Sequence, residues 1–209
     1  MAEDLIFYTN PMSRGRMVRW MLEEVGASYE TRLLGYGGDM KSADYLAINP
    51  MGKVPAIVHG EAVVTEVAAI CCYLADTFPE VALVPQRGRA RAAYYRWMFF
   101  AAGPLEAAVV NRALGVAVSD EQTRMVGYGR YETVMDALEY AVSNGGDYIA
   151  GDRFSAADVY VGSHVLWGLR FGSIDKRPAF EAYAARLTER PAYARAGQID
   201  DALLAAAKA

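Results

Sequence analysis

The chain has 209 residues, of which 54% are hydrophobic and 22% charged, and its net charge is -4. This length suits one large domain or two small ones with a buried core, and the composition excludes a disordered chain. The acidic balance does not favour nucleic-acid binding, and no apolar stretch reaches the roughly 18–20 residues that span a bilayer. We therefore expect a globular protein that binds neither nucleic acid nor membrane.

The start of the chain indicates the cytoplasm, and its cysteines indicate neither a metal site nor a disulfide. The N-terminal Met1-Ala2-Glu3-Asp4 is acidic, whereas a secretory signal begins with basic residues and continues into an apolar run. The two cysteines, Cys71 and Cys72, are adjacent and project about 100° apart on a helix. Such a pair forms neither a metal site nor an ordinary disulfide, so we expect two small, buried apolar side chains.

The first 79 residues alternate between strand and helix signals. Apolar residues recur on one helical face between Ser13 and Gly26, and Gly26 is typical of a helix C-cap. The later segments alternate apolar and polar residues or end at glycines. The predicted order is strand 5–8, helix 13–26, strand 29–34, short helix 41–47, hairpin strands 54–58 and 62–64, and helix 66–77.

The second half of the chain has only helical signals. A long helix is predicted over 87–114, with a kink at Gly103-Pro104 because a proline inside a helix loses a hydrogen bond. A second helix is predicted over 121–142. Ser155 and Asp158 have the spacing of a capping box, which predicts another helix start. We predict one domain over 1–79, a linker over 80–86 and an all-helical domain over 87–209.

The most informative segment is Asn49-Pro-Met-Gly-Lys-Val-Pro-Ala-Ile57, which is followed nine residues later by Glu66 at the head of an apolar helix. Glycine and proline predict a turn, and the β-branched residues after them predict a short strand. A proline directly before a strand removes a donor and, when cis, holds a bend beside which a ligand can bind. We expect a cis peptide bond between Val54 and Pro55.

This combination resembles the glutathione-binding half of the glutathione S-transferase family, in which an N-P-x-G-K-V-P-A segment and an acidic residue at the next helix hold the tripeptide. The β-α-β-α-β-β-α order is similar to the family's thioredoxin-like domain. Ser155–Asp158, 178–183 and 190–193 also resemble family patterns, so the resemblance covers nearly the whole chain. It implies a thioredoxin-like α/β domain followed by an all-α domain. It further implies a cytoplasmic homodimer that activates glutathione, as co-substrate, for attack on an electrophilic apolar small molecule.

The resemblance also implies how glutathione is held. The backbone of Val54, before Pro55, would pair with the cysteinyl residue, and Glu66 would receive the amino group of the γ-glutamyl end. Lys53 would hold the glycyl carboxylate, or it is simply a solvated lysine. Val67 departs from the family, which usually has serine there. Valine keeps its backbone N–H but loses a hydrogen bond of roughly 0.5–1.5 kcal/mol, so we expect weak glutathione affinity or a different ligand.

Three residues at the first strand–helix junction are candidates for activating the thiol. A free thiol has a pKa of about 8.5, and a hydroxyl donor, a helix N-terminus or a cation lowers it. Ser13 combines these features with the neighbouring cation Arg14, although it is equally well explained as an N-cap. Asn10 is the competitor, while Tyr8 fits the strand core. No cysteine is present at this junction, which disfavours cysteine-type chemistry.

The second substrate is expected to contact aromatic side chains of the helical part, namely Tyr95, Phe99 and Trp167, unless these serve the core or a subunit interface. Neither His59 nor His164 has a carboxylate partner at a ligand spacing, so no metal site is predicted. Two alternatives stay open for the function. One is a non-catalytic interaction module of the same fold, and the other is a glutathione-dependent lyase, isomerase or dehalogenase.

Overall fold

The computed structural model describes residues 4–207, and its internal contacts divide the chain into two compact units. The first unit holds the residues up to Val81 together with those from Glu189 onward, and the second is Ala82–Thr188. The domain limits 1–79 and 87–209 stay a prediction. The contacts differ from them in one respect, because the last helix packs on the first helix and groups with the first unit. Residues 1–3 lie outside the described part.

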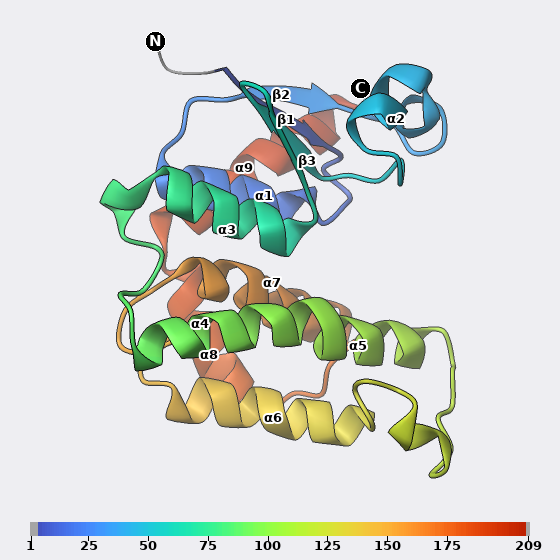
Figure 1. Cartoon of the computed structure of the whole chain (residues 1–209), viewed down its shortest axis with the longest axis vertical. Helices are drawn as coiled ribbons and strands as arrows, with labels where there is room; N and C mark the ends of the chain where they lie inside the picture. The colour runs from blue at the N-terminus through green and yellow to red at the C-terminus, as the bar shows by residue number, and fades with distance from the viewer. Residues whose placement is uncertain (1–3, 208–209) are drawn as a thin grey trace. The chain divides into compact units, whose positions relative to one another are not determined.

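A four-stranded mixed sheet forms the centre of the first unit (Figure 1). Its order is β2-β1-β3-β4; β2 is parallel to β1, whereas the β1–β3 and β3–β4 pairs are antiparallel. The strands are β1 (Leu5–Thr9), β2 (Glu30–Leu33), β3 (Ala56–His59) and β4 (Ala62–Thr65). The predicted strands and the hairpin are confirmed, and so is the α/β character of this part.

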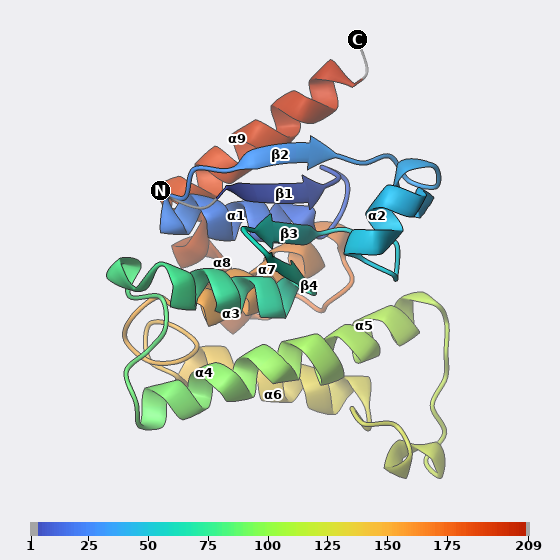
Figure 2. The ribbon, with the colours of Figure 1, turned by 45° about the horizontal axis from the view of Figure 1, so that its top comes forward.

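Helices cover this sheet unequally. Figure 2 shows α1 (Gly15–Val25) and α3 (Val67–Thr77) along the same side of the sheet, and these two helices also contact each other. Every second residue of β1 is fully buried, as expected of a strand with one face on a core. The short α2 (Ala43–Ile48) follows a 3-10 turn, Asp39–Lys41, and packs through Tyr45 on Tyr8, with ring centroids 5.6 Å apart.

The last helix, α9 (Pro191–Ala206), lies against α1 in the first unit. Arg19 Nε donates to Asp200 Oδ1 at 2.8 Å, and both side chains are only 1% exposed. Burial raises the pKa of Asp200, while the Arg19 guanidinium opposes that shift. Arg190 adds two hydrogen bonds to the carboxylate of Glu24, at 2.6 and 2.7 Å. Charged pairs therefore fasten the end of the chain to its first helix.

Apart from an isolated β-bridge between Tyr148 and Gly151, the regular secondary structure described in the second unit is helical. It contains α4 (Arg89–Phe100), a π-helical turn (Ala101–Leu105), α5 (Glu106–Ala113), α6 (Tyr131–Asn144), α7 (Ala156–Phe171) and α8 (Pro178–Thr188). Short 3-10 turns occur at Pro79–Val81 in the first unit and Gln122–Arg124 in the second. The kink expected at Gly103-Pro104 falls at this π-helical turn, which contains Pro104 and interrupts the α-helix there.

One helix start was predicted wrongly. The helix expected from residue 121 begins only at Tyr131, and the residues before it form loop and a 3-10 turn. Gly129 has φ +69, a left-handed conformation that interrupts a right-handed helix. No helix within residues 4–207 is long and apolar enough to cross a bilayer.

The capping box at the start of α7 is confirmed. Asp158 is fully buried, and its carboxylate accepts hydrogen bonds from the backbone of Ile149 (2.8 Å) and from the backbone and hydroxyl of Ser155 (both 2.9 Å). A fourth bond comes from the Tyr183 hydroxyl at 2.8 Å. Burial raises the pKa of Asp158, and these four donors oppose the shift. The helix end is thereby fixed within the core of its unit.

Candidate functional site

The segment before β3 is tied down by side chains from the preceding elements. The Tyr45 hydroxyl and the Asn49 amide both donate to the backbone carbonyl of Lys53, at 2.6 and 2.8 Å. The Lys41 ammonium donates to the carbonyls of the next two residues toward the N-terminus, Gly52 (3.0 Å) and Met51 (3.1 Å). Three consecutive carbonyl oxygens therefore have partners on one side of the segment. Sequence reasoning missed the roles of Tyr45 and Lys41, because no motif marks a contact between side chain and backbone.

The backbone of this segment has the conformation that the sequence indicates. The Val54–Pro55 peptide bond is cis, as predicted. Gly52 has φ +57, and a Cβ atom there would lie 2.6 Å from both the Lys41 ammonium nitrogen and the Met40 carbonyl oxygen. Only glycine fits this position. The Val54 N–H has no hydrogen-bond partner within residues 4–207, so it is available to an added strand.

The N-terminus of α3 is open. Glu66, directly before the helix, has φ 67 and ψ 121, and no side chain caps the helix start. A non-glycine residue in this region is strained by about 1–3 kcal/mol, and such residues cluster at ligand sites. The Glu66 side chain is exposed, whereas Val67 is 8% exposed and turned into the core. The first N–H groups of α3 therefore lack an internal acceptor, next to a free carboxylate.

The Ser13 hydroxyl is hydrogen-bonded to the backbone on both sides of the turn that leads into α1, whose N-cap residue is Arg14. Its hydroxyl donates to the carbonyl of Asn10 at 2.7 Å and accepts from the backbone N–H of Gly15 at 2.9 Å. The helix itself begins at Gly15, two residues after the predicted start, and the Ser13 side chain is buried. A hydroxyl has one hydrogen to donate, and here it is donated in a hydrogen bond to the Asn10 carbonyl oxygen. Ser13 must release Asn10 before it donates to a thiolate.

Asn10 holds the same turn from its other side. Its amide nitrogen donates to the Leu34 carbonyl at 2.8 Å, and its amide oxygen accepts from the Met12 N–H at 2.9 Å. The side chain thus joins the β1–α1 turn to the end of β2, and one amide hydrogen is left for other partners. Arg14 is exposed at the helix start. The structure therefore gathers Asn10, Ser13 and Arg14 at one junction, as their sequence positions predict.

Gly15 lets α1 approach β1 closely. A Cβ atom at this position would lie 1.9 Å from the Thr9 hydroxyl oxygen and 3.0 Å from that of Ser13. Thr9 is fully buried, and its hydroxyl has no hydrogen-bond partner among the described residues. Sequence analysis did not single out Gly15. The signal was a glycine placed at the first turn of a helix, where a close contact is one of few reasons for it.

The expected contacts of the second substrate lie in the helical unit. Tyr95 and Phe99, four residues apart on α4, have 46% and 73% of their surface exposed. The Tyr95 hydroxyl accepts from Arg91 at 3.3 Å. Trp167 is half-buried on α7 and packs edge-on against Phe171, with centroids 6.3 Å apart. Phe99 is therefore the most accessible of the three side chains.

The two histidines have side-chain neighbours within the fold, and the cysteines lie on α3. His164 Nδ1 lies 3.8 Å from a carboxylate oxygen of Glu106, a neighbour that sequence spacing did not reveal because α7 packs on the turn preceding Glu106. His59 Nδ1 lies 3.0 Å from the Tyr73 hydroxyl. Within residues 4–207, no group of three or more His, Cys, Asp or Glu side chains is arranged to hold a metal. Cys71 is buried as predicted, and burial raises the pKa of its thiol, whereas Cys72 is only partly buried and the prediction was wrong there.

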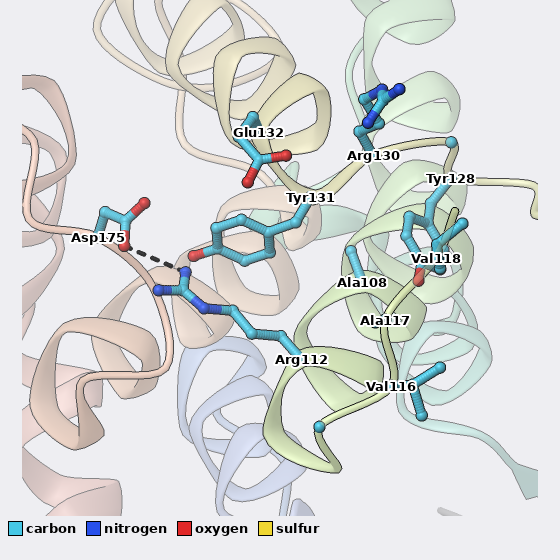
Figure 3. Close-up of a pocket in the computed structure, with 12 residues that line it drawn as sticks. Ala108, Arg112, Val116, Ala117, Val118, Tyr128, Arg130, Tyr131, Glu132 and Asp175 are labelled. Atoms are coloured by element: carbon cyan, nitrogen blue, oxygen red, sulfur yellow. Dashed lines mark hydrogen bonds and ion pairs between the residues drawn. The ribbon is translucent and has the colours of Figure 1, made fainter. Parts of the chain in front are cut away.

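A cavity of about 530 Å³ lies in the helical unit between the end of α5, the loop after it and the start of α6 (Figure 3). Arg112 reaches under the Tyr131 ring, with its guanidinium carbon 4.1 Å from the ring centroid, and donates to Asp175 at 3.1 Å. Arg130, also in the wall, pairs with Asp120. Both arginines of the wall are thus paired with carboxylates.

The chain is similar in sequence to known proteins over most of its length. Residues 12–77 match the family described as glutathione S-transferase, N-terminal domain, and residues 94–191 match its C-terminal domain. Glutathione S-transferase A of Pleuronectes platessa is 32% identical over 174 residues, which cover 78% of this chain and 77% of that protein. A probable maleylacetoacetate isomerase of Vibrio cholerae is 28% identical over 179 residues, covering 80% and 83% respectively.

Solved structures show the same fold. A glutathione transferase homolog from Sulfitobacter, crystallised with bound glutathione, aligns with a TM-score of 0.73 at 26% identity and covers 92% of this chain and 96% of its own. The β1–α1 turn, the cis-proline segment and the head of α3 therefore occur here on a fold that holds glutathione in a relative.

Proposed function

Because this chain belongs to the glutathione S-transferase family, we propose that it binds glutathione and activates its thiol for attack on an electrophilic, largely apolar small molecule. The observation that carries the proposal is the open N-terminus of α3 beside Glu66, whose backbone is held at φ 67. An exposed carboxylate on a residue with a strained backbone, next to free helix N–H groups, suits one ligand group above others. That group is an α-amino acid end, with its ammonium and carboxylate side by side.

The γ-glutamyl end of glutathione supplies such a group. Its ammonium would pair with the exposed Glu66 carboxylate, and its carboxylate would accept from the N–H of Val67 at the helix N-terminus. Val67 offers only this backbone donor, because its side chain is apolar. The carboxylate is therefore held by fewer hydrogen bonds than a hydroxyl side chain would allow, and we expect modest affinity.

The rest of the tripeptide would extend along the segment before β3. The Val54 N–H and C=O would pair with the cysteinyl residue as an added strand, next to the buried ring of Pro55. Lys53 is exposed and close in sequence, so its ammonium would meet the glycyl carboxylate. Lys41 is the less suitable cation, because its ammonium already donates to two carbonyls.

Activation of the thiol is assigned to the β1–α1 junction. Ser13 would donate its hydroxyl hydrogen to the thiolate after releasing Asn10, and the start of α1 and the Arg14 cation would favour the negative charge. Asn10 is the alternative donor, because one of its amide hydrogens is left over. Tyr95, Phe99 and Trp167 are the proposed contacts of the electrophile.

We propose a cytoplasmic homodimer. A groove of about 660 Å³ between α4 and α6, which includes the half-exposed Tyr140 and the exposed Arg96 in its walls, offers a surface for a second copy. Sedimentation at several concentrations tests this point. A chain that stays monomeric at tens of micromolar would contradict it.

Two other functions compete with conjugation. A glutathione-dependent isomerase is favoured by the similarity to the probable maleylacetoacetate isomerase of Vibrio cholerae. A non-catalytic interaction module is favoured by the Ser13 hydroxyl, which donates its hydrogen bond to the Asn10 carbonyl oxygen. Calorimetric titration with glutathione separates the module from both enzymes. Absence of binding at millimolar glutathione would refute the proposed function.

Ultraviolet titration of the bound thiolate then identifies the activator. Ser13→Ala is expected to raise the pKa of the bound thiol, and each unit of pKa corresponds to about 1.4 kcal/mol of lost thiolate stabilisation. The rate of conjugation at neutral pH should fall in proportion to the thiolate lost. If Asn10→Ala raises the pKa while Ser13→Ala only lowers the melting temperature, Asn10 is the activator and Ser13 is a helix cap.

A further inference from the structure

The segment Met51–Val54 is held from one side only. The carbonyls of Met51 and Gly52 accept from the Lys41 ammonium, and the carbonyl of Lys53 accepts from both Tyr45 and Asn49. A carbonyl oxygen has two lone pairs, so two donors saturate the Lys53 oxygen. The donors come from α2, the turn before it and the residue that ends it.

The Lys53 carbonyl and the Val54 N–H belong to one rigid peptide plane. In a trans peptide these two groups point in opposite directions, and rotation about the C–N bond is blocked by its partial double-bond character. The cis bond of this segment is the next one, between Val54 and Pro55. Fixing the Lys53 oxygen toward α2 therefore fixes the Val54 N–H on the opposite side, where it has no partner within residues 4–207.

We propose that Tyr45 and Asn49, which hold the Lys53 carbonyl, and Lys41, which holds the two carbonyls before it, are positioning residues that fix the Lys53–Val54 peptide plane so that the Val54 N–H faces the cysteinyl residue of glutathione. The inference rests on the proposed function, because it assigns a support to the same site. None of the three side chains needs to touch the ligand. Their effect is to hold the edge of the segment in one orientation before the ligand arrives, which lowers the entropy lost on binding.

The Tyr45 hydroxyl is the decisive member of this group. Its ring is 3% exposed, lies on Tyr8 and belongs to a small cluster with Met40 and Ala56. A phenylalanine would fill that space equally well, so packing alone does not require the hydroxyl. Burial raises the pKa of Tyr45 to about 12, which keeps the hydroxyl protonated and donating throughout the neutral range.

The experiment compares Tyr45→Phe with Tyr29→Phe. Tyr29 is a matched control because its hydroxyl is also hydrogen-bonded, to Arg19 and Glu23, and burial raises its pKa to about 12 as well. We expect Tyr45→Phe to raise the glutathione Kd by about three- to tenfold, while Tyr29→Phe changes it less than twofold. The pKa of the bound thiol should stay the same in Tyr45→Phe, because the lock acts on binding and not on the thiolate.

Two results would overturn the proposal: unchanged affinity in Tyr45→Phe, or an equal loss of affinity in Tyr29→Phe. If Tyr45→Phe does not fold, Lys41→Met serves instead, since Lys41 is exposed and methionine keeps its apolar stem. The same loss of affinity is expected, and parental affinity would refute the lock.

A measurement without ligand separates this inference from the proposed function. Amide ¹⁵N relaxation should show an order parameter of about 0.85 for Val54 in the parent and a lower value in Tyr45→Phe or Lys41→Met. A parent that fails to bind glutathione refutes the function, whereas equal order parameters refute the lock.

Discussion

The N-termini of α7 and α3 differ in how their first backbone N–H groups find hydrogen-bond acceptors. The N-terminus of α7 is closed: Ser155 and Asp158 satisfy its N–H groups, and the carboxylate of Asp158 accepts four hydrogen bonds in the core. The N-terminus of α3 has no side-chain cap, and the residue before it is strained and exposed. Every helix leaves its first N–H groups without partners inside the helix. Where the chain supplies no acceptor for these N–H groups, a carboxylate of a ligand can accept hydrogen bonds from them.

The largest effect is expected at the start of α7, on the stability of the fold. Asp158→Ala removes a buried carboxylate and leaves its donors, among them the Tyr183 hydroxyl, without an acceptor. The free energy of unfolding should fall by about 3–5 kcal/mol, measured by urea denaturation. Asp152→Ala is the control, because Asp152 is exposed, and it should change stability by less than about 0.5 kcal/mol. Equal losses in both variants would show that the capping box does not stabilise the unit.

A substitution at the uncapped start of α3 should change the affinity for glutathione and not the stability of the fold. Glu66→Gln keeps the size and the backbone of the residue but removes the charge that would pair with the ligand ammonium. We expect the glutathione Kd to rise by about ten- to hundredfold, as for a hydrogen bond between charged groups. The melting temperature should stay within a degree or two of the parent. Unchanged affinity in calorimetry would remove Glu66 from the site.

A gain of function at the same end is the smallest predicted effect. Val67→Ser adds a hydroxyl beside the free N–H groups of α3 and should tighten glutathione binding by a few-fold, about 0.5–1 kcal/mol. Val67 is buried, so stability should fall by about 1–2 kcal/mol through lost apolar burial. If affinity does not improve, the carboxylate is satisfied by another donor.

The sequence predicted the elements of both units well, because each is marked by local chemistry. Gly26 ends α1, Pro104 marks an irregular turn, and Ser155 and Asp158 mark a helix start. The helix expected from residue 121 begins only at Tyr131, after Gly129 with its positive φ. Local signals therefore identified most helix starts but missed the loop before α6.

The candidate site was only partly predictable. The cis bond before Pro55 followed from the motif, and Glu66 followed from its place before an apolar helix. The hydrogen bond from Tyr45 to the Lys53 carbonyl joins a side chain to a backbone atom eight residues away, and no residue pattern encodes that direction. The hydrogen-bond acceptor of the Ser13 hydroxyl was not predictable either. A serine at this position can hydrogen-bond to the turn or donate to a thiolate, and only the structure shows that it donates to the Asn10 carbonyl.

The ion pair between Arg19 and Asp200 also limits the order in which the two units can finish folding during translation. The two residues are 181 positions apart, so at typical rates of synthesis Arg19 leaves the ribosome about 10–40 s before its partner exists. All of Ala82–Thr188 is made within that interval. The N-terminal unit therefore cannot bury Arg19 with its counter-charge during early translation. We expect the unit encoded second to finish folding first, while the unit encoded first waits for the last helix of the chain.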